Sequence, residues 1–172
     1  PDLKRLLCNA IIQPHFDYAN LAWYSNLNLN LKNKLQIMQN KCIRYCLNLG
    51  HMAHIGLAEF EKMNWLNNDD RFLQCVCTTT YNYFEGKIPT FMSEIFEAAP
   101  QSIICSRFSL DRLILPRIKT NMGLNALSYL GPQQWNKIPN HLKECNNVNT
   151  FKHKLKTHFF KIHKDREKMG YT

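Results

Sequence analysis

The basic side chains near the C-terminal end are the residues most clearly arranged for chemistry in this 172-residue sequence. Apolar residues recur there at helical spacing, so they would occupy one face of a helix and leave the basic side chains pointing outward. Asp165 and Glu167 are the only acids between residues 148 and 172. The basic residues of this segment, which also contains three histidines, are Lys152, Lys154, Lys156, Lys161, Lys164, Arg166 and Lys168.

A cationic ridge of this kind binds phosphate groups by releasing condensed counterions, without reading a base sequence. The same pattern also fits a solvated helix face or contact with an acidic membrane surface. The chain has 22 Lys and Arg against 13 Asp and Glu, a formal charge of +9. Residues 1–86 carry a net charge of +1 and residues 87–172 a net charge of +8. This asymmetry indicates a polyanionic partner at one end of the chain.

A second set of cations lies on a helix that the periodicity predicts from about residue 30 to residue 49. Gly50 suits the position that ends such a helix. The predicted inward stripe consists of Leu31, Leu35, Met38, Cys42, Tyr45, Cys46 and Leu49. The cations, Lys32, Lys34, Lys41 and Arg44, lie mostly off this stripe and are candidates for contact with phosphates.

Cysteine and histidine residues near position 50 resemble a metal site at first sight. Zinc sites usually place two residues between their cysteines, on a turn, whereas Cys42 and Cys46 are four residues apart within the predicted helix. We therefore interpret them as small buried residues, with His51 and His54 in the following link. Neighbouring thiols at 75–77 would diverge on a helix. The sequence thus predicts no metal site and no cofactor.

No arrangement of residues typical of catalysis is found in the sequence. It lacks a nucleophile elbow, a phosphate-binding glycine loop and a His-Glu-x-x-His helix. The adjacent acids Asp69 and Asp70 resemble a helix cap rather than a magnesium site, and Trp23 and Trp135 fit core anchors better than base-stacking platforms. With seven cysteines and no recognisable signal peptide or apolar span, we expect reduced thiols in an intracellular protein, in cytoplasm and nucleus.

These residues must be positioned by a mainly α-helical fold. The patterns predict helices at 2–13, ending before Pro14, at 18–24 with Asp17 as a cap, at 57–66, and from Asp69 or Asp70 to Phe84. A short helix is expected after Pro89, and two strands at about 110–130 form a hairpin-like element. A basic helix capped by Asn147 closes the chain. We expect segments 1–50, 51–106 and 107–172 to form one continuous compact unit.

Several segments taken together resemble the region that follows the palm of non-LTR retrotransposon reverse transcriptases, of the jockey-like and chicken-repeat-like kind. One is a Leu-x-x-x-Gln-x-x-x-x-Arg helix, here Leu35, Gln39 and Arg44, and another is the Gly-x-x-x-Trp-Asn element that begins at Gly131. The closing element is Phe-Lys-x-x-Leu-Lys, from Phe151. The segments follow the family's order at 11–23, 35–44, 86–89, 115–117, 131–139 and 151–156.

The resemblance implies the thumb and C-terminal extension of an RNA-directed DNA polymerase, and therefore a fragment of a larger protein. Such an enzyme uses Mg²⁺ held by palm aspartates, and its thumb holds the primer–template duplex. The aromatic-x-Asp-Asp turn of the palm is not in this sequence, so no catalytic residue is carried over. The implied partners are RNA, DNA and an upstream palm, without a membrane or a small-molecule substrate. A structural or protein-interaction module, or a decayed element, is the alternative.

Overall fold

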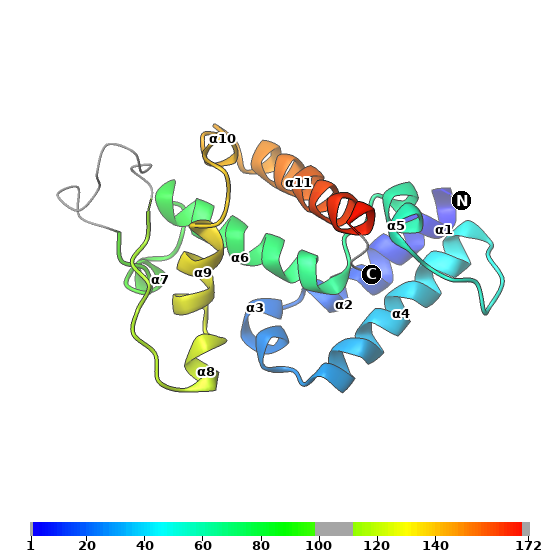
Figure 1. Cartoon of the computed structure of the whole chain (residues 1–172), viewed down its shortest axis with the longest axis horizontal. Coiled ribbons are helices and arrows are strands. Elements are labelled where there is room, and N and C mark those ends of the chain that lie inside the picture. Colours follow the sequence, from blue (N-terminus) through cyan, green and yellow to red (C-terminus); the bar gives the residue numbers. More distant parts are fainter. Residues whose placement is uncertain (1, 99–111, 170–172) are drawn as a thin grey trace. The chain divides into compact units, whose positions relative to one another are not determined.

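The computed structural model describes residues 2–98 and 112–169 and is mainly helical, as predicted (Figure 1). The helices of the first half are α1 (Asp2–Leu7), η1 (Cys8–Ile12), α2 (Gln13–Asp17), α3 (Asn20–Trp23), η2 (Tyr24–Asn26), α4 (Leu29–Leu47), α5 (Leu57–Met63) and α6 (Asn68–Phe84). The later helices are α7 (Thr90–Ser93), α8 (Asn121–Leu124), α9 (Leu127–Trp135), α10 (Asn140–Lys143) and α11 (Val148–Lys168).

The chain divides into two compact units, and both boundaries lie inside long helices. The first unit contains residues 1–72 and 156–172, and the second contains residues 73–155. Helix α6 therefore begins in the first unit and continues in the second, and α11 does the reverse.

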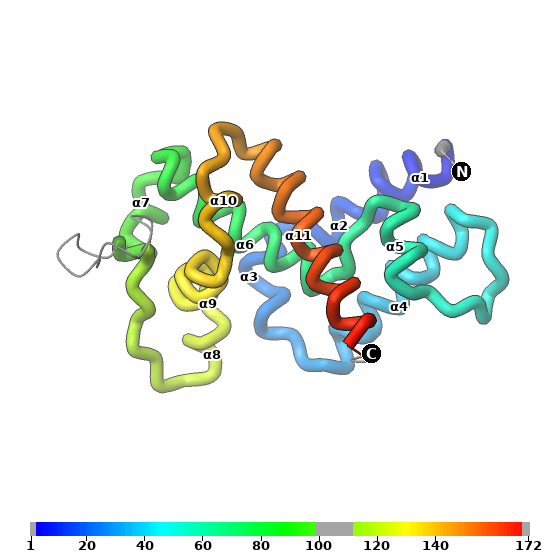
Figure 2. Tube along the Cα trace, turned by 45° about the horizontal axis from the view of Figure 1, so that its top comes forward, coloured from blue at the N-terminus to red at the C-terminus, as the bar shows by residue number. Residues whose placement is uncertain are grey.

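The first unit is organised around α4, against which both α1 and α5 lie (Figures 1 and 2). Its core contains cysteines and aliphatic residues together with Phe60 and Trp65. The buried line of α4 is Gln39, Cys42, Ile43 and Cys46. The predicted stripe is therefore partly wrong, because Met38 and Tyr45 are more than half exposed. Gln39 can be buried because its Nε2 donates to the Leu66 carbonyl at 2.8 Å.

The first helical run does not end before Pro14, contrary to the prediction. Residues 8–12 form a π-helix in which the Gln13 N–H donates to the Cys8 carbonyl. This wider turn places Pro14 in the first turn of α2, where a missing N–H costs nothing. Three predicted caps are also wrong. Ala19 precedes α3 in the left-handed region, and Asn48, not Gly50, ends α4 in the same conformation. Asn67, not Asp69 or Asp70, caps α6, since its Oδ1 accepts from the Asp70 N–H at 2.7 Å.

The second unit has an aromatic core. The rings of Tyr81 and Phe151 stack at 4.7 Å between centroids, and those of Phe84 and Trp135 at 5.0 Å. Gly131 of α9 packs so closely on Phe96 that an added Cβ would lie 2.4 Å from a ring carbon. A larger residue at position 131 would therefore force these elements apart.

The predicted β-hairpin at about 110–130 is wrong for the described residues of that segment. Residues 121–124 and 127–135 are helical, and the described part of the chain holds one isolated bridge, between Ala98 and Leu113, in place of a sheet. The side-chain amide of Asn136 makes the backbone hydrogen bonds to Leu113 that a neighbouring strand would otherwise make. Its Oδ1 accepts from the Leu113 N–H at 3.2 Å and its Nδ2 donates to the Leu113 carbonyl at 2.9 Å.

Candidate functional site

Helix α11 contains the basic residues that the sequence places in a cationic ridge, and local sequence explains which face of the helix is buried. The Asn147 side chain accepts from the Asn149 N–H at 2.8 Å, which caps the first turn. Phe151 and Leu155 are completely buried and fix the inner face. Lysines on other faces of the helix, Lys152, Lys154 and Lys161, are exposed.

Of the remaining predicted cations of α11, Lys156 and Lys164 bind groups within the first unit. Lys156 is half-buried and its ammonium donates to the Asn64 carbonyl. Burial, and to a lesser degree the charge of Arg71, lowers the pKa of Lys156. Lys164 pairs with Glu61 at 2.7 Å. Arg166 lines a cavity of the same unit.

The predicted cations of α4 divide in the same way. Lys32 pairs with Asp69 at 3.7 Å and lies 4.9 Å from the centroid of the Tyr24 ring. The Nε of Arg44 donates to the Ala53 carbonyl at 2.9 Å, which anchors the link that follows the helix. Lys34 and Lys41 are exposed. On the two helices, the predicted cations that project into solvent therefore include Lys34, Lys41, Lys152, Lys154 and Lys161.

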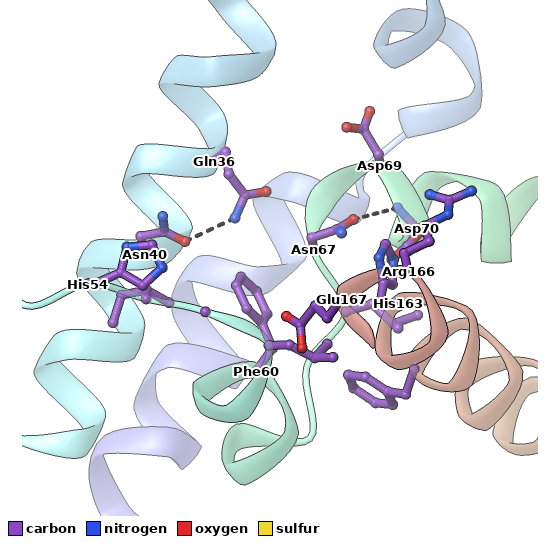
Figure 3. Close-up of a pocket in the computed structure, with 15 residues that line it drawn as sticks. Gln36, Asn40, His54, Phe60, Asn67, Asp69, Asp70, His163, Arg166 and Glu167 are labelled. Atoms are coloured by element: carbon purple, nitrogen blue, oxygen red, sulfur yellow. Dashed lines mark hydrogen bonds and ion pairs between the residues drawn. The ribbon is translucent and has the colours of Figure 1, made fainter. Parts of the chain in front are cut away.

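A cavity of about 530 Å³ lies within the first unit (Figure 3). Gln36 and Asn40 of α4 lie on one side of it, and Asp70 of α6 and His163 of α11 lie on the other. The Gln36 amide donates to Asn40 Oδ1 at 3.0 Å. The remaining lining residues are His54, Ile55, Gly56, Leu57, Phe60, Leu66, Asn67, Asp69, Phe160, Arg166 and Glu167.

The polar centre of this cavity is the pair formed by Asp70 and His163. The imidazole Nε2 and the Asp70 Oδ2 are 2.5 Å apart, and the carboxylate is largely buried. Burial raises the pKa of Asp70, and the facing imidazole opposes that rise. Such a pair can hold and move a proton, but the residues lining the cavity include no hydroxyl or thiol that could act as a nucleophile. No sequence pattern indicated this pair, because its members are 93 residues apart.

Cys42 and Cys46 are small buried residues, as the sequence analysis interprets them. Cys8, Cys42 and Cys46 belong to the core of the first unit, and the Cys8 and Cys46 sulfurs are 3.6 Å apart. Burial, together with the neighbouring Cys8, raises the pKa of Cys42 to about 11, so this thiol stays protonated at neutral pH. His51 and His54 are exposed. The described residues contain no cluster of three side chains suited to a metal ion.

The motif residues that carry the family resemblance have internal structural roles. Gln39 and Arg44 each bind a backbone carbonyl of the first unit. In the second unit, Trp135 is almost fully buried and Asn136 binds Leu113. These motif residues therefore serve packing within each unit.

Comparison with known protein families, with curated proteins and with solved structures found no significant match to this chain. In the parts of the chain that the structure describes, every helix is too short or too polar to cross a membrane.

Proposed function

We propose that this chain binds nucleic-acid backbones through the outer faces of α11. The observation that carries the proposal is the exposure of Lys152, Lys154 and Lys161 on a helix whose inner face is fixed by buried residues. No acidic residue occurs in α11 before Asp165, so nothing within that stretch neutralises these charges. Exposed cations on a helix without nearby acidic residues are suited to a polyanion.

The spacing of the lysines favours contact with phosphates over base readout. Lys154 and Lys161 are seven residues apart, about two helical turns or roughly 10 Å along the axis. Duplex DNA carries one negative charge per about 1.7 Å, so such a row faces several phosphates in any register. The exposed lysines lack the bidentate geometry that arginine uses to read guanine. The proposed binding is therefore strong at low salt and nearly independent of sequence.

In the family that the sequence resembles, this role belongs to the region that holds the primer–template duplex beside the palm. We propose that the chain is the non-catalytic C-terminal part of such an RNA-directed DNA polymerase. The Mg²⁺ chemistry would then belong to the palm aspartates, and holding the duplex would increase processivity rather than the rate of the chemical step. The support is the order of the motifs together with the exposed cations.

The test is the salt dependence of binding to a mixed-sequence duplex. The triple variant Lys152→Gln, Lys154→Gln and Lys161→Gln should reduce the slope of log K against log salt by about 0.9 for each duplex phosphate that the variant no longer neutralises. The matched control, Lys62→Gln, Lys119→Gln and Lys137→Gln, removes the same charge from exposed lysines elsewhere. Its slope should stay close to that of the wild type.

Two results would contradict the proposal. An unchanged slope in the α11 variant would remove this helix from the interface. An equal reduction in both variants would show a response to net charge alone, and the solvated-face interpretation would then hold. The alternative function, a protein-interaction module, is favoured by a different observation, an apolar groove in the first unit.

A further inference from the structure

The apolar groove lies in the first unit between the α1–η1 run and α4, away from the proposed phosphate-binding lysines of α11 in sequence and in chemistry. Its volume is about 280 Å³. Its lining is Leu7, Cys8, Ile11, Ile12, Lys41, Cys42 and Tyr45. Lys41 is the one charged residue in that lining, and the other side chains present carbon, sulfur and one phenol.

Large apolar side chains are exposed on the two helical segments that form the groove. On the α1–η1 run, Leu3, Leu6 and Ile11 are 69%, 64% and 61% exposed. On α4, Met38 and Tyr45 are 51% and 53% exposed. Leu7, Ile11 and Tyr45 both line the groove and are exposed, and an exposed apolar groove typically marks a protein-interaction site, whereas single exposed apolar residues need no explanation.

The π-helix explains why this surface forms. The widened turn at residues 8–12 buries Cys8 against Cys46 while Ile11 remains on the outside. An uninterrupted α-helix would have distributed these residues differently around its axis. π-turns are uncommon and occur frequently at functional positions. Here the turn contributes Cys8, Ile11 and Ile12 to the lining of the groove.

Two cations lie at the groove. The Lys4 ammonium lies 4.7 Å from the centroid of the Tyr45 ring, and Lys41 lines the groove itself. Helix α4 contains Lys32, Lys34, Lys41 and Arg44 and no acidic residue, and residues 3–16 contain no acid either. A partner must therefore be apolar at its centre and negatively charged at its edge.

We propose that the groove binds an amphipathic helix of a protein partner, one with an aliphatic stripe flanked by glutamate or aspartate. Aliphatic anchors at positions i, i+3 or i+4, and i+7 would enter the groove, and the acids would meet Lys4 and Lys41. A lipid surface fits less well, because a concave groove between two helices accepts side chains and a flat bilayer does not fill it. The apolar lining does not suit a nucleic-acid backbone. This inference does not depend on the α11 proposal.

The test uses two synthetic helical peptides of about five turns with the same leucine stripe, one flanked by glutamates and the other by lysines. Their binding to the full chain is followed by fluorescence anisotropy at constant ionic strength. We expect the acidic peptide to bind at least about tenfold more tightly than the basic peptide. Lys41→Glu should narrow that difference, because it reverses the charge at the rim.

The groove is tested by Ile11→Glu, which should lower the affinity of the chain for the acidic peptide by at least about tenfold. The matched control is Met52→Glu, since Met52 is 87% exposed in the same unit and outside the groove. Tyr45→Ser provides a second groove variant should Ile11→Glu unfold, as judged by circular dichroism. Both substituted groove residues are more than half exposed, so folding should be retained.

Four outcomes would overturn the proposal. The first is equal affinity for the acidic and the basic peptide, and the second is unchanged peptide affinity in Ile11→Glu and Tyr45→Ser. In the other two, neither peptide binds and something else occupies the groove. In the first such case, vesicles of phosphatidylcholine and phosphatidylserine bind the wild type but not Ile11→Glu, which would show a lipid surface. In the second, sedimentation shows a dimer that Ile11→Glu dissociates, which would show that a second copy occupies the groove.

Discussion

In the second unit large apolar side chains meet one another, as Tyr81 and Phe151 do, whereas in the first unit several of them face outward, as Leu3 and Ile11 do. The buried polar groups differ in the same direction. In the second unit Tyr81 Oη donates to the Cys145 carbonyl and Thr80 Oγ1 to the Val76 carbonyl. In the first unit, buried amide atoms lack a hydrogen-bond partner among the described residues on Gln13, Asn20 and Asn68.

This contrast indicates that the second unit serves mainly as a scaffold and that the first unit presents the binding surfaces. A unit whose aromatic rings and polar groups satisfy one another gains most of its stability internally. A unit that exposes apolar residues and buries unpaired amides has given up internal stability, and such sites concentrate where a protein binds something else. The groove and the polar cavity both lie in the first unit. Four substitutions test the contrast, taken in order of the expected effect.

The largest effect should come from the aromatic core of the second unit. Trp135 is 1% exposed, and Trp135→Ala should lower the free energy of unfolding by about 3–5 kcal/mol, because it leaves a cavity beside Phe84 and Phe151. Phe91→Ala is the matched control in the same unit, at a residue that is 75% exposed, and should change stability by less than about 0.5 kcal/mol. Urea unfolding measures both. Similar losses for the two variants would contradict a closed aromatic core.

A smaller loss is expected at a satisfied polar group of the first unit. Gln39 is fully buried and its amide donates to the Leu66 carbonyl. Gln39→Leu keeps a similar volume and leaves that carbonyl unpaired, which should cost about 1–3 kcal/mol in urea unfolding. A neutral or stabilising result would mean that this amide adds nothing to the fold.

The long helices could be predicted because their signals are local. Periodic apolar residues, the cap at Asn147 and the end near Gly86 are sufficient for α6 and α11, and Gly86 has the expected positive φ of 65°. The second strand expected within residues 110–130 is wrong for a non-local reason. Its residues form α9 because Gly131 and Trp135 pack on the aromatic core, and no short pattern reports that contact.

The candidate site was only partly accessible from sequence. The sequence predicts which residues are cationic, but not which of them bind carbonyls or acids across the first unit, as Arg44 and Lys164 do. The groove could not be predicted from local patterns, because its lining combines the α1–η1 run with α4, two helices that meet only in the folded chain. The pairing of Asp70 with His163 requires the folded chain, since nothing in either neighbourhood specifies the other.

Substituting the unpaired glutamine, Gln13, by leucine should change the free energy of unfolding in the direction opposite to Gln39→Leu. Gln13 is 3% exposed, and neither its Nε2 nor its Oε1 has a hydrogen-bond partner among the described residues. Gln13→Leu therefore removes a desolvated amide and adds apolar contact, and we expect a gain of about 1 kcal/mol in urea unfolding. If Gln13→Leu and Gln39→Leu both destabilised the chain, the Gln13 amide would contribute to stability as the Gln39 amide does. Burying the Gln13 amide would then carry no free-energy cost for the first unit.

The smallest effect concerns the pH dependence of the Asp70 pair. Because burial raises the pKa of Asp70 above its ordinary value of 3.8, the folded state binds more protons than the unfolded state just above that value. The free energy of unfolding of the wild type should therefore fall, through this group, as the pH rises from about 3.5 to about 5.5, whereas Asp70→Asn lacks this contribution. The stability of Asp70→Asn relative to the wild type should rise over that interval, by about 1 kcal/mol or less. His163→Gln removes the imidazole that opposes the rise in the pKa of Asp70, so stability should fall more steeply with pH in this variant than in the wild type. If the stability of Asp70→Asn relative to the wild type fell as the pH rose, the imidazole would outweigh burial.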